Sequence, residues 1–213
     1  VESTRGLLRA ACAIARHERP TSELHETEAK IDNLIETVRR RVHTPNIQAR
    51  LAHLHDVLFD VVCLRGNVED YYSPANSYLP EVLRTKRGLP ISLVLIYKCV
   101  GEGVGLTVHG INSPGHFLAG VECPRETSPP DDRSSLMYVD PFYGGGLLTE
   151  ADAFNRIAET TGRQMPKSPE LLAPATNRQW LERMLANLQA AFASLGRERD
   201  LLAMQELHAL LYA

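Results

Sequence analysis

Three residues of this chain, Ser92, His116 and Asp140, have the side chains of a hydrolytic triad. A carboxylate that binds one imidazole nitrogen fixes the tautomer, and the other nitrogen can then take the proton of a nucleophile. A serine hydroxyl is much harder to ionise than a thiol, so Ser92 would depend fully on His116 as its base. The alternative is a structural role, in which Ser92 satisfies backbone donors of a first helical turn.

A central helix is expected to carry Ser92. Residues 91–100 are apolar on nearly every side, as in a helix that is buried all round, and the stretch is too short to span a membrane. Gly88 is expected to end the preceding helix in a left-handed conformation, and Pro90 fits the first turn of the central helix. Ser92 then lies at the positive end of this helix.

Three strands are predicted after the central helix, because the chain there alternates between apolar and polar residues or runs apolar between turns. The strands are expected at residues 107–111, 116–122 and 136–140, with an exposed loop at residues 123–135. If Glu122 pairs with Ser134 across this loop, His116 lies opposite Asp140. Directly opposed side chains have Cβ atoms roughly 4.5–5.5 Å apart, so these two could form a hydrogen bond.

We predict this pair of His116 and Asp140 whether or not the protein is an enzyme. A desolvated imidazole needs a hydrogen-bonding partner, and Asp140 is the partner that strand pairing provides. The pair is expected at the N-terminal end of the central helix, with Asn76 and Ser92 nearby. That end of a helix also favours an anion or a peptide carboxylate, for which Asn76, Ser92 and His116 are the predicted contacts.

Helices are also predicted before the central helix. Residues 5–16 are rich in Ala and Leu, and Ser22 is suited to cap a second helix. A third helix is expected at residues 46–64, where leucine and valine recur at helical spacing. Asn76 could then cap a short helix that runs through Arg84.

The C-terminal part is predicted to be a helical hairpin. Thr176 and Gln179 have the spacing of a capping box, and two amphipathic helical patterns follow. The arrangement resembles one tetratricopeptide unit, which needs neighbours to bury its apolar faces. We therefore expect the hairpin to pack on the main domain or on a partner.

Four motifs together resemble the SirB-type transglutaminase-like family and occur in the order found there. They are residues 70–79 (DYYSPANSYL), 87–93 (RGLPISL), 114–118 (PGHFL) and 139–142 (VDPF). The resemblance implies an α+β fold with a papain-like or transglutaminase-like core, in which a buried central helix packs on an antiparallel sheet. The expected parts are an N-terminal helical region at residues 1–45, the core at 46–161, and a linker with the tetratricopeptide-like hairpin at 162–213.

The resemblance assigns His116 and Asp140 to the superfamily's histidine and aspartate. Its nucleophilic cysteine would fall at or beside Pro90, so the chain departs from the active pattern. This implies a non-catalytic regulatory module that binds a protein or peptide. The alternative is an amide or ester hydrolase, or a peptidase, that uses Ser92, His116 and Asp140.

The composition of the chain argues against several other functional classes. The 213 residues are 44% hydrophobic and 23% charged, and the formal net charge of −3 gives no basic footprint for nucleic acid. The four cysteines are far apart and lack C-x-x-C spacing, which argues against a zinc site and suits a reducing compartment. No membrane segment or signal peptide is apparent. We expect a cytoplasmic protein without a metal or cofactor.

Overall fold

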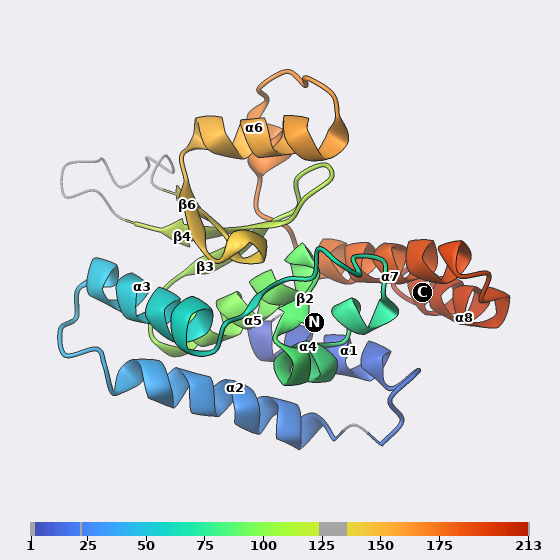
Figure 1. The fold of residues 1–213 in the computed structure, drawn as a ribbon, viewed down its shortest axis with the longest axis horizontal. Coiled ribbons are helices and arrows are strands. Elements are labelled where there is room, and N and C mark those ends of the chain that lie inside the picture. Colours follow the sequence, from blue (N-terminus) through green and yellow to red (C-terminus); the bar gives the residue numbers. More distant parts are fainter. Residues whose placement is uncertain (1–2, 22, 124–135, 213) are drawn as a thin grey trace.

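The computed structural model describes residues 3–21, 23–123 and 136–212, and it combines a four-stranded sheet with helices from both ends of the chain (Figure 1). The sheet lies between α6 on one side and the helices of the first half of the chain on the other. The helices before the sheet are α1 (Thr4–Ala15), α2 (Leu24–Arg39), α3 (Ile47–His55), α4 (Leu79–Thr85) and α5 (Pro90–Gly103).

The central helix is α5. Pro90 occupies its first turn, and nearly every side chain from Pro90 to Val100 is buried. Five other helices, α1, α2, α3, α4 and the C-terminal α7 (Asn177–Ser194), contact α5, as do two strands of the sheet. This enclosure explains why the sequence of α5 is apolar all round.

The sheet is antiparallel throughout, in the order β3-β4-β5-β6. Its strands are β3 (Val108–Ile111), β4 (Leu118–Glu122), β5 (Leu136–Asp140) and β6 (Gly146–Leu148), and β6 was not predicted. Glu122 pairs with Leu136, so the expected register with Ser134 is wrong by two residues. Ser134 itself lies outside the described residues. A shift of two residues leaves each side chain on the face that was expected.

A short parallel pair, β1 (Arg65–Gly66) and β2 (Arg87–Gly88), precedes α5. The prediction that Gly88 ends a helix in a left-handed conformation is wrong, because Lys86 holds that conformation at the end of α4, with φ 61°. Gly88 is required for space instead: a Cβ atom there would lie 2.8 Å from Ser92 Oγ.

Two of the predicted N-terminal helices differ in detail. The third helix changes after His55 into a π-helix, Asp56–Val61, instead of continuing as an α-helix. Asn76 caps no helix, because it lies inside a 3-10 turn, Pro74–Ser77, and its side chain bonds to a loop. Ser22 lies outside the described residues, and Glu23 is the N-cap of α2.

The chain continues after the sheet with α6 (Glu150–Thr161), α7 and α8 (Glu198–Ala209). The predicted capping box of Thr176 and Gln179 is confirmed at the start of α7. Helices α7 and α8 pack on one another, yet α7 buries seven side chains and α8 fully buries only Met204. Trp180 of α7 sits on Gly110 of β3, where a Cβ atom would find no room.

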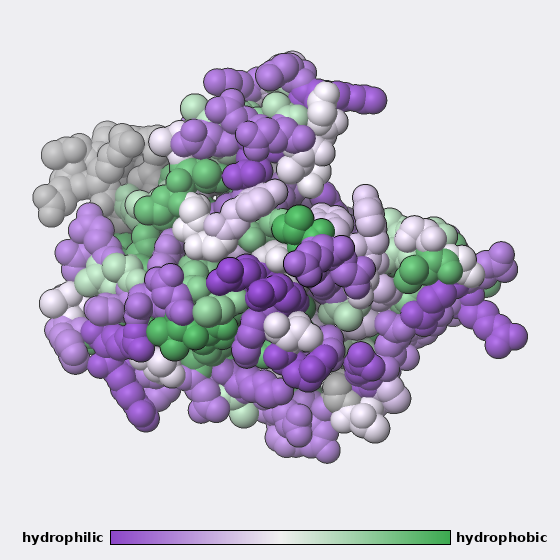
Figure 2. Space-filling model, in the orientation of Figure 1, coloured by the Kyte–Doolittle hydropathy of each residue, from purple (hydrophilic) through white to green (hydrophobic). Residues whose placement is uncertain are grey.

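One apolar core joins α1, α5 and α7, since its buried members include Leu7, Leu95 and Leu188, whereas α6 packs on the sheet in a second cluster. On the face seen in Figure 2, hydrophobic surface gathers near the end of α3 and along the C-terminal helices, within a largely hydrophilic surround. None of the helices in the described ranges is long and apolar enough to cross a membrane.

Candidate functional site

The structure brings His116 and Asp140 together. His116 precedes β4 in the turn that leaves β3, and Asp140 is the last residue of β5. His116 Nε2 lies 3.0 Å from each carboxylate oxygen of Asp140, and the two side chains are 4% and 1% exposed. A carboxylate accepts hydrogen bonds, so Nε2 carries the hydrogen atom in this contact.

Asp140 has two further contacts. Its Oδ1 accepts the backbone N–H of Phe142 at 3.2 Å, which caps the 3-10 turn Pro141–Tyr143. Arg156 of α6 places Nε 3.3 Å from Oδ2, at ion-pair distance, although this N–H makes no hydrogen bond to a described residue. A carboxylate this deeply buried needs such compensation, because an unpaired buried charge is costly.

Ser92 is held away from this chemistry. Its hydroxyl is fully buried and lies 2.7 Å from the carbonyl oxygen of Asn76 and 2.9 Å from that of Leu89. Both Ser92 and His116 are among the described residues, and no hydrogen bond joins them. The hydroxyl therefore connects α5 to the preceding turn, but it contacts backbone acceptors and not the backbone donors that were expected.

Asn76 is also used internally. Its Nδ2 donates to the carbonyl oxygens of Asp70 at 2.6 Å and Tyr71 at 3.1 Å, while its Oδ1 accepts from Asn67 at 2.9 Å. Its own carbonyl oxygen accepts from Ser92. Asn76 thus ties the loop that carries Tyr71 to the N-terminal end of α5, and its side chain is occupied by these loop contacts.

Aromatic residues surround the pair, and sequence reasoning gave them no role. The His116 ring lies 5.9 Å from Phe142 and 6.1 Å from Tyr143, and Tyr71 lies 5.9 Å from Phe142 between ring centroids. Tyr143 is 52% exposed and Tyr71 37%. The signal that could have identified them is adjacency, because each follows a motif aspartate by one to three positions. We call Tyr71, His116, Asp140, Phe142 and Tyr143 the α5-end site.

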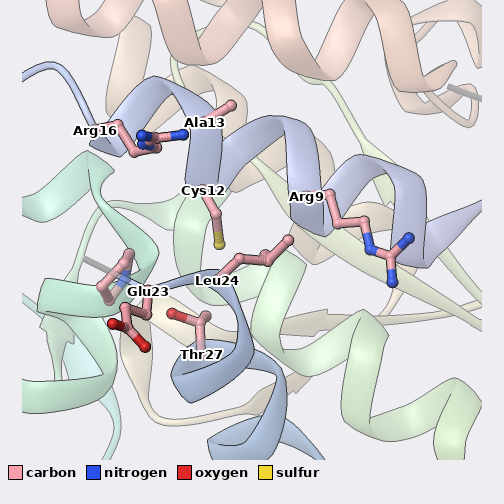
Figure 3. Close-up of a pocket in the computed structure, with 8 residues that line it drawn as sticks. Arg9, Cys12, Ala13, Arg16, Glu23, Leu24 and Thr27 are labelled. Atoms are coloured by element: carbon pink, nitrogen blue, oxygen red, sulfur yellow. The ribbon is translucent and has the colours of Figure 1, made fainter. Parts of the chain in front are cut away.

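Three of the four cysteines are poorly suited to act as a nucleophile. Burial raises the pKa of Cys12 to about 11 and that of Cys99 to about 12, and it also raises the pKa of Cys123. Reactive cysteines have the opposite shift. Figure 3 shows Cys12 beside a hollow lined by α1 and α2. Cys99 lies about 13 Å along α5 from Pro90 at the helical rise per residue, and Cys63 is exposed after the π-helix.

The described residues contain no group of three or more histidine, cysteine, aspartate or glutamate side chains placed to hold a metal ion. The site therefore offers an imidazole, a buried carboxylate and an aromatic surface. Such a set can orient a polar ligand and cover it with rings.

A match to a family model identifies the family of this chain. A model described as the transglutaminase-like superfamily matches residues 25–186, a range that includes the entire α5-end site. This chain belongs to the transglutaminase-like superfamily. His116 and Asp140, which the resemblance assigns to the superfamily's histidine and aspartate, are in hydrogen-bond contact.

Within this superfamily, the chain is similar to proteins named UPF0162. It is 30% identical over 200 residues to the one from Xylella fastidiosa strain 9a5c, covering 92% of this chain and 68% of the relative. The Vibrio cholerae UPF0162 protein is 24% identical over 200 residues, covering 93% and 70%. Human F-box only protein 21 is 26% identical over 217 residues, covering 91% of this chain and 33% of that protein. No solved structure matches the chain.

Proposed function

We propose that this superfamily member is a non-catalytic regulatory module, which binds a protein or peptide at the α5-end site. The observation that carries the proposal is the hydroxyl of Ser92, which is fully buried and bonded to backbone carbonyls. Pro90 stands where the resemblance expects the cysteine. A histidine and aspartate pair without a nucleophile at the helix end cannot form an acyl-enzyme intermediate.

The proposal also includes the family subgroup, the type of core and the cellular location. We infer a SirB-type member with a papain-like core, supported by the burial of α5 against β3 and β4. The contact between α7 and α8 supports the tetratricopeptide-like hairpin. We place the protein in the cytoplasm, since all four cysteines are free, as is usual in a reducing compartment.

The kind of ligand follows from the side chains that are exposed. Tyr71 and Tyr143 present half-exposed rings beside a buried polar pair. Tyrosine provides a large, rigid contact area and a polar end, and it is enriched among the residues that dominate binding to other proteins. Neither exposed ring contributes to the buried core. We therefore assign them to contact with a peptide.

The proposal is tested by selecting peptides from a random phage-displayed library and measuring their affinity for purified variants. We expect Tyr143→Ala to weaken binding by about tenfold, as loss of a central aromatic contact does. Tyr212→Ala is the matched control, because Tyr212 is also an exposed tyrosine whose ring lies against an arginine, Arg178, as Tyr143 lies against Arg156. Selected peptides that bind both variants like the wild type would contradict the assignment.

The wild type and the variants His116→Ala and Ser92→Ala are screened for turnover of ester, amide and peptide libraries. We expect no turnover by the wild type and a lower melting temperature for His116→Ala, because the variant leaves Asp140 without its imidazole partner. A hydrolase would give the opposite pattern. Turnover that disappears in both His116→Ala and Ser92→Ala, with melting temperatures unchanged, would overturn the non-catalytic proposal.

A further inference from the structure

Arg183 of α7 lies next to the α5-end site. Its Nη1 donates to Asn112 Oδ1 at 3.0 Å, and the contact is partly buried. Asn112 and His116 belong to the same turn between β3 and β4. Tyr71 and Arg183 also act on one another electrostatically. The guanidinium is therefore bonded to the turn that carries His116 and close to the segment that carries Tyr71.

Arg183 differs from Arg156 and Arg178, which both have carboxylate partners. Arg156 pairs with Asp140 and Glu159, and Arg178 pairs with Glu182 one turn along α7. No carboxylate among the described residues forms an ion pair with Arg183, and an asparagine oxygen is its recorded hydrogen-bond acceptor. A half-buried cation with no negative partner is unfavourable, and burial accordingly lowers the pKa of Arg183.

The free part of the guanidinium has a defined chemistry. One N–H is held by Asn112, which fixes the orientation of the planar group. The geometry of the remaining N–H groups matches two oxygens of a carboxylate, which arginine binds through a pair of parallel hydrogen bonds. Burial raises the pKa of Tyr71, so its phenol is neutral and can donate a further hydrogen bond.

We propose that Arg183 receives a carboxylate of the peptide that binds at the α5-end site, with the Tyr71 hydroxyl as a second donor. The proposal rests on the proposed function and adds the chemical class of the ligand. The carboxylate would supply the negative charge that the described part of the chain does not. An acidic side chain and a free C-terminus provide the same group, and the experiment separates them.

Three pools of random N-acetylated octapeptides without acidic or basic residues distinguish these sources. One pool ends in an amide, the second in a free carboxylate, and the third carries one fixed Glu and an amide. Affinity for the full-length protein is measured by fluorescence anisotropy. We expect at least one carboxylate pool to bind about tenfold more tightly than the neutral pool. Tighter binding of the second pool would identify a free C-terminus as the ligand, and tighter binding of the third pool would identify an acidic side chain.

Arg183→Gln is expected to remove this preference and to leave the affinity of the neutral pool unchanged. Arg183→Lys should retain only part of it, because an ammonium group cannot make the paired hydrogen bonds. Arg178→Gln is the matched control on the same helix and should keep the full preference, since its guanidinium pairs with Glu182. If Arg183→Gln fails to fold, the arginine Nε–H NMR signals of the wild type are followed during titration with each pool.

The outcomes separate this proposal from the one on which it rests. Equal binding of the three pools, weakened by Tyr143→Ala but not by Arg183→Gln, would overturn the carboxylate proposal and support the peptide site. A titration in which the Arg183 signal stays fixed while the carboxylate pool binds would also overturn it. Failure of every pool to bind the wild type would refute both.

Discussion

His116 and His55 are both paired through Nε2 with side chains that come from distant parts of the chain, and their partners differ in charge. His116 contacts the carboxylate of Asp140. His55, at the end of α3, lies 2.9 Å from the Tyr97 hydroxyl on α5, with the Phe59 ring 5.3 Å away. Burial lowers the pKa of His55 to about 4 and raises that of Tyr97, so this second pair is neutral.

The charge of the residue that contacts each histidine distinguishes a packing contact from a candidate functional site. The pair of His55 and Tyr97 connects the end of α3 to the central helix and carries no charge. The pair of His116 and Asp140 includes a buried carboxylate that Arg156 faces, and exposed rings lie beside it. Burial alone does not mark a functional site, whereas a buried charged group with access to a surface does.

The largest effect is expected from Asp140→Ala, which removes the charged partner. His116, the N–H of Phe142 and Arg156 would each lose a contact in the interior. Breaking a buried ion pair from one side costs about 3–5 kcal/mol in the free energy of unfolding, measured by urea denaturation. Asp152→Ala, which removes an exposed carboxylate from a helix cap, should cost much less. Similar losses for both variants would remove the distinction between the two kinds of carboxylate.

The neutral pair is tested by pH. The pKa of His55 is about 4 in the folded protein and near 6.5 when unfolded, so between these values the unfolded state binds the proton more readily. Stability is therefore greatest above pH 6.5 and falls as the pH drops toward 4, by up to about 3 kcal/mol for this histidine.

We expect His55→Gln to remove this part of the pH dependence of the unfolding free energy. Tyr97→Phe should retain most of it, because burial is the main cause of the lowered pKa. A wild-type slope that survives in His55→Gln would mean that other groups produce it. A slope that disappears in Tyr97→Phe would show that the phenol, and not burial, keeps His55 neutral.

The smallest effect is expected from Ser92→Ala, although Ser92 lies at the end of the central helix. The carbonyl oxygens of Asn76 and Leu89 keep backbone partners at 3.1 Å when the hydroxyl is removed. Losing a hydrogen bond without stranding its acceptors costs about 1 kcal/mol or less. A loss in the range expected for Asp140→Ala would place Ser92 in the same charged unit as His116.

Local sequence signals predicted the parts that depend on neighbours along the chain. The bounds of α5 follow from Pro90 and from the apolar run, and the capping box of α7 follows from Thr176 and Gln179. The contact between His116 and Asp140 was predicted from two opposed strand positions, but His116 reaches Asp140 from the turn before β4, so strand pairing predicted only that the two residues are close.

The parts that depend on distant contacts could not be predicted in this way. Asn112 and Arg183 are 71 positions apart, and no periodicity connects a turn to a later helix. Asn76 has the residue type of a helix cap, but its amide is taken by the loop before it. Glycine is needed at position 88 because Ser92 approaches closely. From the sequence alone, Gly88 indicated only a turn at the end of a helix.

The contact of α7 with β3 also determines when the sheet edge becomes covered during synthesis of the chain. β3 is an edge of the sheet, and its Gly110 carbonyl accepts the N–H of Ala175 at 2.7 Å, while Ile111 bridges to Pro174. An open edge attracts other strands and promotes aggregation. During synthesis, β3 emerges more than sixty residues before the segment that covers it. The nascent sheet therefore has an unprotected edge until Trp180 arrives, and early release of the chain would leave that edge open to its neighbours.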